Sequence, residues 1–567
     1  MASTLPHLPI FEAISKHDPE SVAIVHSSTG QEFRYGKLLQ DVVAARNEIT
    51  QRNEKGAFEG ERIAFLMENS YAYVVTILSI FACNAIAVPL SPGFPGSELR
   101  YILEQSQAKL IMTSESLRSK APNKETVEGH ATWETRVAKD YGSIRSESGD
   151  IELEHLSSNS GGLMLYTSGT TNRPKGVLLP QSAVTAQSQT LLEAWKYSPK
   201  DYLLHILPLH HIHGLANAVL TPLFAGSTIE FMSPFSAQTC WERIGAPFTS
   251  EGTKKRPITF FTAVPTIYTR LLESHPNLPE DLQQATRRAI SPENLRLNIS
   301  GSAALPTPVK SKWTELSGGN VLLERYGMTE IGMGLSCGLD INDRVDGSVG
   351  WPFASVEARL VDTDTKEVIP VGEELGADGK ERQGEIQIRG PMVFKEYWRN
   401  PEATATEFTT DEDGKGPWFK TGDVAVRRVV ESAGKSAQDW AKGPMYFIQG
   451  RQSADIIKTG GEKVSALEVE REMLSLPQIA ECAVVALPSD AWGQKVAAVV
   501  VLTEQGKTAG RGGKAWSALD LRRSLKDRLV NYKIPQEMKV VESIPKNAMG
   551  KINKKMLVKE IFPSATS

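Results

Sequence analysis

The alternation of apolar, strand-like runs with helix-like stretches constrains the fold of this 567-residue chain more than any other sequence feature. Strand-like runs occur at 62–67, 109–113, 201–208, 227–231, 258–265 and 295–300. Helical patterns lie between them, at 71–83, 214–223 and 266–273. This order predicts βαβ units, in which helices cover parallel sheets. We therefore expect an α/β protein.

The sequence pattern changes twice further along the chain. Beyond about Val349, short strands at 357–361 and 384–390 alternate with Gly, Pro and Asp turns, which predicts a small antiparallel, barrel-like subdomain. From Gly450 onward, helical and strand patterns predict an α+β domain of about 115 residues, enough for a core of its own. We expect a large N-terminal domain over 1–450 and a small C-terminal domain over 451–567.

Composition excludes several classes of protein. A formal net charge of −4 without an extended basic tract argues against nucleic acid as a partner. The four cysteines lie far apart, which predicts neither a zinc ribbon nor a disulfide framework and favours a reducing compartment. A histidine cluster at 210–213 has no acidic partner at ligand spacing, so structural zinc is not expected.

The run 73–90 is apolar enough to suggest a membrane span, but Thr76, Ser79, Asn84 and Pro89 interrupt it. We predict instead a buried helix to Ala82 and a strand around 85–89. The first residues lack the pattern of a secretory signal or a transit peptide, and the last four are not a peroxisomal signal. A cytoplasmic location is expected, and a mitochondrial one stays open.

Residues 166–177 place small hydroxyls, glycines and one cation directly after an apolar strand-like run. Glycine lets backbone N–H groups approach an anion, hydroxyls donate further hydrogen bonds, and Lys175 supplies a charge. Pro174 and Gly176 on either side of that lysine do not fit a Walker P-loop, so we expect the segment to close a hairpin and bind phosphate. A polar surface turn is the alternative for a generic run of this composition.

Residues 324–330 follow the strand-like run 320–323, and we expect them in a loop at the end of a strand, where α/β sheets form ligand crevices. Tyr326 can stack on a purine, Thr329 can bind a phosphate oxygen, and Glu330 can bind Mg²⁺. Taken alone, this segment fits an ordinary turn equally well.

Both segments resemble signatures of the adenylate-forming superfamily, which includes the acyl-CoA synthetases. The resemblance covers nearly the whole chain, through the segments 300–305, 418–423, 450–464 and 545–552. It implies an ATP- and Mg²⁺-dependent ligase that joins a small carboxylic acid to coenzyme A through an acyl-adenylate, releasing AMP and pyrophosphate. It also implies that the C-terminal domain is mobile.

The resemblance implies roles for individual residues. Catalysis is assigned to Lys175, Thr329, Glu330 (also the metal ligand) and Lys551, which would bridge the carboxylate and the α-phosphate. Coenzyme A would contact Gly460, Gly461 and Lys463, and the domain would turn at Ser453, where the family usually has Asp or Lys. The implied nucleotide-binding residues are Thr167, Ser168, Gly169, Thr170, Thr171, Lys175, Gly301, Ser302, Ala303, Glu324, Arg325, Tyr326, Gly327, Met328, Thr329, Asp423 and Arg451.

An arginine directly before Tyr326, here Arg325, resembles the pattern of the malonyl-CoA synthetase branch of the superfamily. A second carboxylate on the substrate needs a cation in an apolar pocket, and a guanidinium can bind both of its oxygens. We expect Arg325 and Arg270 to bind that carboxylate and His213 to line the pocket. In the alternative, Arg325 pairs with Glu324, Arg270 is a surface residue and His213 is structural.

Malonate is therefore the expected acid. Another short or medium-chain (di)carboxylic acid, or a stand-alone adenylation enzyme, is the alternative. A carrier-loading module is disfavoured because no carrier domain follows within the sequence. A luciferase-type oxidase or a non-catalytic binding protein would share the fold. The oxidase would emit light with ATP and oxygen, and the binding protein would not catalyse ATP–pyrophosphate exchange.

Overall fold

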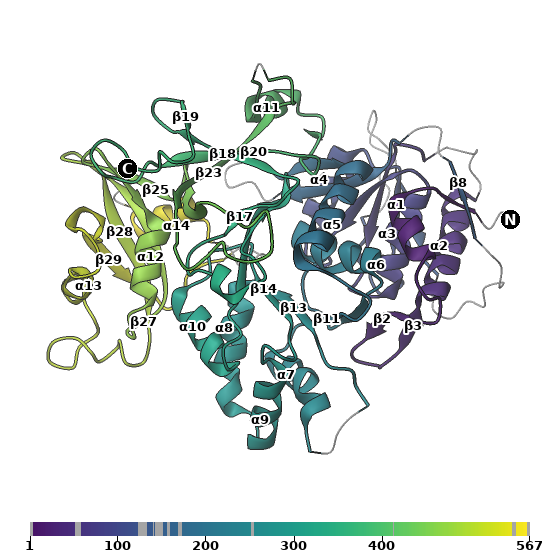
Figure 1. Cartoon of the computed structure of the whole chain (residues 1–567), viewed down its shortest axis with the longest axis horizontal. Helices are drawn as coiled ribbons and strands as arrows, with labels where there is room; N and C mark the ends of the chain where they lie inside the picture. The colour runs from purple at the N-terminus through teal and green to yellow at the C-terminus, as the bar shows by residue number, and fades with distance from the viewer. Residues whose placement is uncertain are drawn as a thin grey trace.

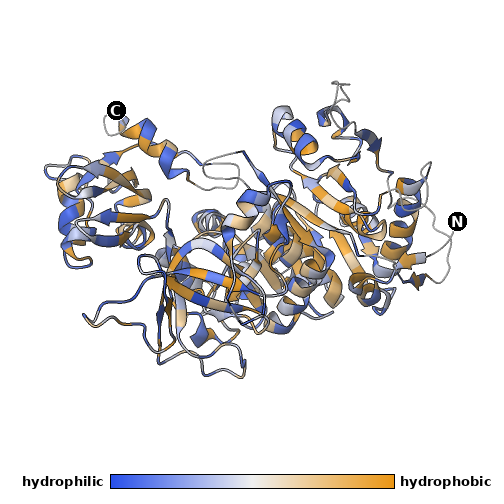
Figure 2. Cartoon of the chain, turned by 90° about the horizontal axis from the view of Figure 1, so that it is seen from above, coloured by the Kyte–Doolittle hydropathy of each residue, from blue (hydrophilic) through white to orange (hydrophobic). Residues whose placement is uncertain are grey.

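The computed structural model describes residues 4–51, 58–122, 133–139, 141, 151–155, 159–167, 173–250, 254–411, 413–546 and 552–563. The N-terminal residues lie at one end of the long axis and the C-terminal α+β region at the other, with an antiparallel sheet between them (Figure 1). Apolar residues concentrate on the strands inside the sheets (Figure 2). The predicted α/β class, antiparallel subdomain and C-terminal α+β region are confirmed.

The first large sheet has the strand order β21 (Glu396–Tyr397), β10 (Lys175–Pro180), β9 (Gly162–Thr167), β5, β4, β6 and β7 (Glu134–Val137). Its centre is parallel: β4 (Arg62–Leu66) pairs with β5 (Ile86–Leu90) and β6 (Leu110–Thr113). The connecting helix α3 (Tyr71–Ala82) is buried along almost its whole length. The apolar run 73–90 is thus a buried helix and a strand, as predicted, and no helix in the described part of the chain is long and apolar enough to cross a bilayer.

The second large sheet carries the residues of the acid and adenine sides of the predicted site. Its parallel core contains β11 (Tyr202–His205), β12 (Thr228–Phe231), β13 (Phe260–Ala263) and β14 (Leu297–Ser300). Between β11 and β12 we expected one α-helix, but residues His213–Leu220 form a π-helix that continues into the short α6 (Thr221–Ala225). The Cβ of an alanine at 214 would lie 2.2 Å from the Pro208 carbonyl oxygen, so only glycine fits at this close approach.

The antiparallel sheet positions the ribose side of the predicted site. Its main strands are β18 (Glu357–Asp362), β20 (Gly384–Arg389), β23 (Trp418–Arg428) and β24 (Met445–Arg451), each antiparallel to the next. The ring of Phe394 packs against Phe408 and against Phe419, which lies on β23 of this sheet. The short α11 (Pro401–Glu407) leads into this sheet.

The C-terminal region forms a small sheet with its own core. The strands β27 (Ile479–Ser489) and β28 (Gly493–Leu502) pair over ten positions, and α12 (Ala466–Leu474) packs on β27. The helices α13 (Ala518–Leu525) and α14 (Lys554–Ile561) complete the region. Apolar side chains from α12, β27, β28 and α13 form a cluster separate from the cores of the large sheets. The predicted boundary at 450/451 falls at the end of β24 and stays a prediction.

Candidate active site

The predicted phosphate segment closes a hairpin, as expected. The strands β9 (Gly162–Thr167) and β10 (Lys175–Pro180) are antiparallel, and Lys175 lies opposite Thr167 in the register. The Lys175 ammonium lies 4.5 Å from the centre of the Tyr397 ring, a cation–π contact. The predicted residues Ser168, Gly169, Thr170 and Thr171 lie outside the described residues, as does Lys551.

The segment 324–330 is not the loop that we expected. The strand β15 (Leu323–Met328) extends through it, first parallel to β14 and then antiparallel to β16 (Gly332–Ser336). A register shift between Tyr326 and Gly327 bends the strand. Thr329 and Glu330 form the turn together with Ile331. The pairing partner β16 makes this strand possible, because it satisfies backbone groups that a loop would expose.

Tyr326, Asp423 and Arg451 form one contiguous group. The Tyr326 hydroxyl donates to Asp423 Oδ2 at 2.6 Å, and Arg451 Nε lies 2.9 Å from Asp423 Oδ1. Asp423 and Arg451 face each other because β23 and β24 pair at these positions. Burial, followed by the Asp423 charge, raises the pKa of Tyr326 well above its usual value, so its hydroxyl stays a donor. The Asp423 carboxylate, which Arg451 holds in place, can accept hydrogen bonds from the hydroxyl groups of a ribose.

Glu330 is a buried carboxylate beside Lys175. The Tyr397 hydroxyl donates to Glu330 Oε1 at 2.9 Å, while the ring of the same tyrosine contacts Lys175. Burial raises the pKa of Glu330 above its usual value. Mg²⁺ is commonly bound by one or two carboxylates together with substrate phosphates, and Glu330 fits such a site. No local sequence pattern indicates Tyr397, which lies 67 residues from Glu330 along the chain.

His213, Ser302 and Arg325 come together on the second large sheet. His213 Nδ1 lies 3.1 Å from Ser302 Oγ and its Nε2 lies 2.7 Å from Thr262 Oγ1, while Arg325 Nη2 donates to Ser302 Oγ at 3.2 Å. Burial, and then the Arg325 charge, lowers the pKa of His213 well below its usual value, so the ring is neutral. Gly301 packs on the guanidinium, Ser302 has a left-handed φ of 69°, and Ala303 is exposed.

Arg325 does not pair with Glu324, the alternative considered from the sequence. Glu324 is bound instead by Lys310, whose Nζ donates to Glu324 Oε1 at 2.7 Å. Arg325 is 4% exposed, its Nε has no hydrogen-bond partner in the described part of the chain, and no carboxylate described there forms an ion pair with it. Burial lowers the pKa of Arg325 to about 10, which leaves the side chain charged at neutral pH.

Arg270 contacts a residue outside the cluster of His213, Ser302 and Arg325. It is exposed on α8 (Pro265–Ser274), and its guanidinium lies 4.8 Å from the centre of the Phe235 ring. This position fits the alternative that Arg270 is a surface residue. A role of Arg270 in binding the acid stays a prediction.

The predicted coenzyme A residues lie around a turn of the C-terminal α+β region. Gly460 and Gly461, both with left-handed φ, join β25 (Ile456–Thr459) to β26 (Glu462–Ser465). Lys463 Nζ lies 2.6 Å from Asp364 Oδ2, beyond the end of β18 in the large domain. Ser453, the predicted pivot, is exposed in the turn after β24.

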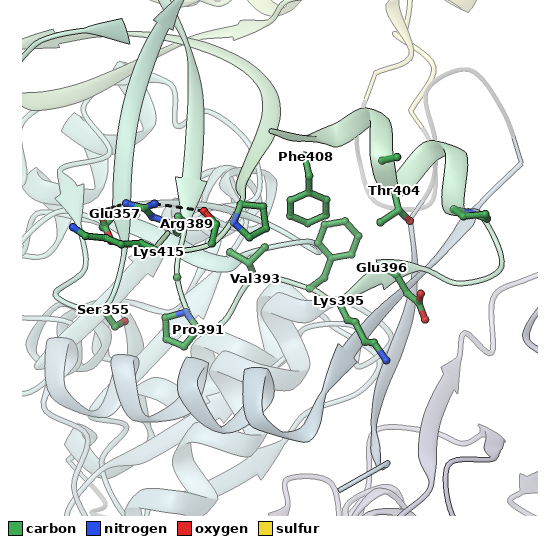
Figure 3. A pocket seen from close by; sticks show the side chains of 16 residues that line it. Ser355, Glu357, Arg389, Pro391, Val393, Lys395, Glu396, Thr404, Phe408 and Lys415 are labelled. Atoms are coloured by element: carbon green, nitrogen blue, oxygen red, sulfur yellow. Dashed lines mark hydrogen bonds and ion pairs between the residues drawn. The ribbon is translucent and has the colours of Figure 1, made fainter. Parts of the chain in front are cut away.

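A pocket of about 870 Å³ opens between the end of β20 and α11 (Figure 3). None of the predicted site residues lines it. Arg389 at its wall is bound by Glu357 at 2.6 Å and by Asp413 at 2.8 Å, so its charge is already compensated. The pocket adjoins the candidate site at Phe394, whose amide donates to the Glu330 carbonyl at 2.8 Å.

The chain belongs to the AMP-binding enzyme family, whose profile matches residues 11–398, while that of the AMP-binding enzyme C-terminal domain matches residues 468–551. It is an ATP-dependent, AMP-forming CoA ligase, which uses ATP, Mg²⁺ and coenzyme A. The adenylate-forming resemblance inferred from the sequence is confirmed.

Particular relatives are similar over most of their length. A CoA ligase of Gibberella moniliformis is 55% identical, with 97% of this chain and 94% of the relative covered. The mitochondrial malonate–CoA ligase ACSF3 of Homo sapiens is 40% identical, with 90% and 84% covered. The crystal structure of ATP-bound MatB from Rhodopseudomonas palustris is 30% identical and superposes with a TM-score of 0.77, with 99% of this chain and all of MatB covered.

Proposed function

We propose that this protein is a malonate–CoA ligase, which converts malonate to malonyl-adenylate with ATP and then transfers the malonyl group to coenzyme A. The observation that carries the proposal is the buried, uncompensated charge of Arg325. Burying a cation without a partner is unfavourable, and a substrate carboxylate would offset that cost. His213 and Ser302 beside it offer polar contacts for a short, charged acid.

Relatives support this choice of acid. Besides the human protein, a malonate–CoA ligase of Arabidopsis thaliana is 35% identical over 95% of this chain. The sequence position before Tyr326 and the absence of a carboxylate partner for Arg325 among the described residues point the same way.

The chemistry requires control of charge. A free carboxylate does not acylate a thiol, whereas an acyl-adenylate does because AMP is a good leaving group. Lys175 and Lys551 would reduce repulsion between the acid and ATP, and Asp423 would bind the ribose. Mg²⁺, held by Glu330, would supply Lewis-acid stabilisation of the phosphates. Gly460, Gly461 and Lys463 would line the path of the coenzyme A thiol.

An acid panel tests the proposal. Purified protein is incubated with ATP, Mg²⁺, coenzyme A and malonate, methylmalonate, succinate, acetate or propionate, and AMP and the acyl-CoA are quantified. We expect malonate to give the highest kcat/KM. Preference for a monocarboxylate, or release of ADP and phosphate instead of AMP, would contradict it. Adenylate without thioester would favour the stand-alone adenylation alternative.

A further inference from the structure

A buried lysine outside the predicted site lies in the C-terminal region, beside the turn that follows β24. Lys554 is the first residue of α14, and its Nζ lies 2.6 Å from Asp455 Oδ1 and 2.7 Å from Glu470 Oε1. The three side chains are only 11%, 15% and 14% exposed. Burial by itself would lower the pKa of Lys554, but the two carboxylates outweigh it and raise the pKa, so the ammonium stays charged.

Asp455 connects this ion cluster to the ribose side of the site. Its second oxygen, Oδ2, accepts from the backbone N–H of Arg451 at 3.0 Å, and the Arg451 side chain binds Asp423. Gly450 provides the necessary space, because a Cβ there would lie 2.4 Å from the Asp455 Cβ. A continuous chain of contacts therefore runs from Lys554 through Asp455 and Arg451 to Asp423.

The chain of contacts crosses the predicted pivot. Arg451 precedes Ser453 and Asp455 follows it, so the bond between Asp455 and the Arg451 amide joins the two sides of the turn. A charged acceptor makes this bond stronger than a neutral one. Without the Lys554 ammonium, two carboxylates would share one buried site, and their repulsion would displace Asp455 or force its protonation.

We propose that Lys554 and Asp455 are positioning residues for adenylate formation: they fix the turn after β24 so that the Arg451 guanidinium holds Asp423 for the nucleotide. They act through Arg451 and do not contact the substrate. This inference rests on the proposed ribose role of Asp423 and the proposed pivot at Ser453. Rotation at Ser453 breaks the bond between Asp455 and Arg451, so the thioester-forming half reaction does not depend on it.

The test compares two isosteric substitutions in the same ion cluster. Asp455→Asn removes the charge that binds Lys554 and the Arg451 amide. Glu470→Gln removes the other charge, whose carboxylate contacts Lys554 and the Val484 amide but not Arg451. Lys554→Met and Lys554→Arg probe the ammonium, and Lys555→Met, at the exposed neighbouring lysine, is the surface control.

Each variant is assayed in both half reactions with the acid that gives the highest activity in the unmodified protein. For Asp455→Asn and Lys554→Met we expect the KM for ATP in ATP–pyrophosphate exchange to rise about tenfold, the effect of losing one charge-assisted hydrogen bond. Thioester formation from preformed acyl-adenylate should change less than twofold. Glu470→Gln should lower the melting temperature with the KM for ATP within about twofold, and Lys554→Arg should recover part of the loss.

The proposal would be overturned if Asp455→Asn and Glu470→Gln lost activity equally in both half reactions, in proportion to the fall in their melting temperatures. The ion cluster would then be purely structural. Normal ATP–pyrophosphate exchange in Asp455→Asn or Lys554→Met would also overturn it. Failure of the proposed function is distinguishable, because the unmodified protein would then lack malonate-dependent turnover.

Discussion

Arg325 is the residue on which the choice of substrate depends. Its guanidinium is buried with a single hydrogen bond, to Ser302, among the described residues. The folded protein holds its proton only up to a pH of about 10, because burial lowers the pKa from 12.5. Between these two pKa values the unfolded chain therefore binds more protons than the folded protein. The free-energy cost of burying the charged guanidinium is fully present at neutral pH and decreases as the pH rises above 10. That cost is about 3 kcal/mol.

Arg325→Met should therefore stabilise the substrate-free protein while it abolishes use of malonate. Methionine fills a similar volume without a buried charge, and we expect the free energy of unfolding to rise by about 1 to 3 kcal/mol. Urea denaturation at neutral pH, monitored by circular dichroism, measures the change. A destabilised variant would show that the guanidinium is well compensated in the free protein.

Tyr397 is predicted to orient the metal ligand. Tyr397→Phe keeps the ring against Lys175 but removes the hydroxyl that donates to Glu330. We expect the Mg²⁺ concentration for half-maximal rate to rise about fivefold with a smaller change in the KM for malonate. Titration of activity with Mg²⁺ after chelation measures this. An unchanged Mg²⁺ requirement with a weaker binding of malonate would contradict the assignment.

Site residues were predictable from the sequence where the residues next to them along the chain form a distinctive pattern. Lys175 and Arg325 were identifiable because each lies within a short segment of distinctive composition. Tyr397 was missed because its contact to Glu330 is formed only after two sheets assemble, and a tyrosine in 394–398 has no local feature that indicates metal chemistry. The pairing of Glu324 with Lys310 likewise depends on tertiary structure.

At the scale of elements, local patterns predicted the hairpin of β9 and β10 but not the strand through 324–328. The hairpin is closed by neighbouring residues, whereas β15 extends because β16 returns along it and supplies backbone partners. The π-helix at His213–Leu220 was also missed, because the spacing of apolar residues barely distinguishes it from an α-helix.

The loop after β14 should control the position of Arg325. A Cβ on Gly301 would lie 2.5 Å from Arg325 Nε, so Gly301→Ala has to displace the guanidinium. We expect kcat/KM for malonate to fall at least about tenfold, with a smaller loss for acetate, because the backbone around the nucleotide is retained. Steady-state kinetics with both acids measures the ratio.

Gly96→Ala is the matched control for this substitution. Gly96 begins α4 (Gly96–Ser106), and a Cβ there would meet no atom within 4 Å. It should leave both activities unchanged. Equal losses for malonate and acetate in Gly301→Ala would indicate a general distortion of the loop.

At the level of the whole molecule, the order of the α/β, antiparallel and α+β parts followed from the periodicity of apolar residues and from the positions of turn residues. The orientation of the small domain did not, since it is set by contacts between distant segments such as Lys463 with Asp364 and Lys380 with Glu462. Such surface ion pairs are weak individually, as the proposed change of orientation of the C-terminal region requires.

The proposed reaction through an acyl-adenylate predicts separable half reactions. Malonate-dependent ATP–pyrophosphate exchange should proceed without coenzyme A, because the adenylate forms before the thiol is required. Exchange of labelled pyrophosphate into ATP, with and without coenzyme A, measures this. A strict requirement for coenzyme A in the exchange would show that the thiol enters before the acid is activated, contrary to the proposed sequence.

The selectivity of Arg325→Ala between malonate and acetate, measured as CoA-dependent AMP release, shows whether Arg325 binds the second carboxylate of the acid. If Arg325 binds the second carboxylate, kcat/KM for malonate should fall at least about a hundredfold, while that for acetate changes less than about threefold. Equal losses for the two acids, or malonate use retained without the guanidinium, would show that Arg325 does not bind this carboxylate.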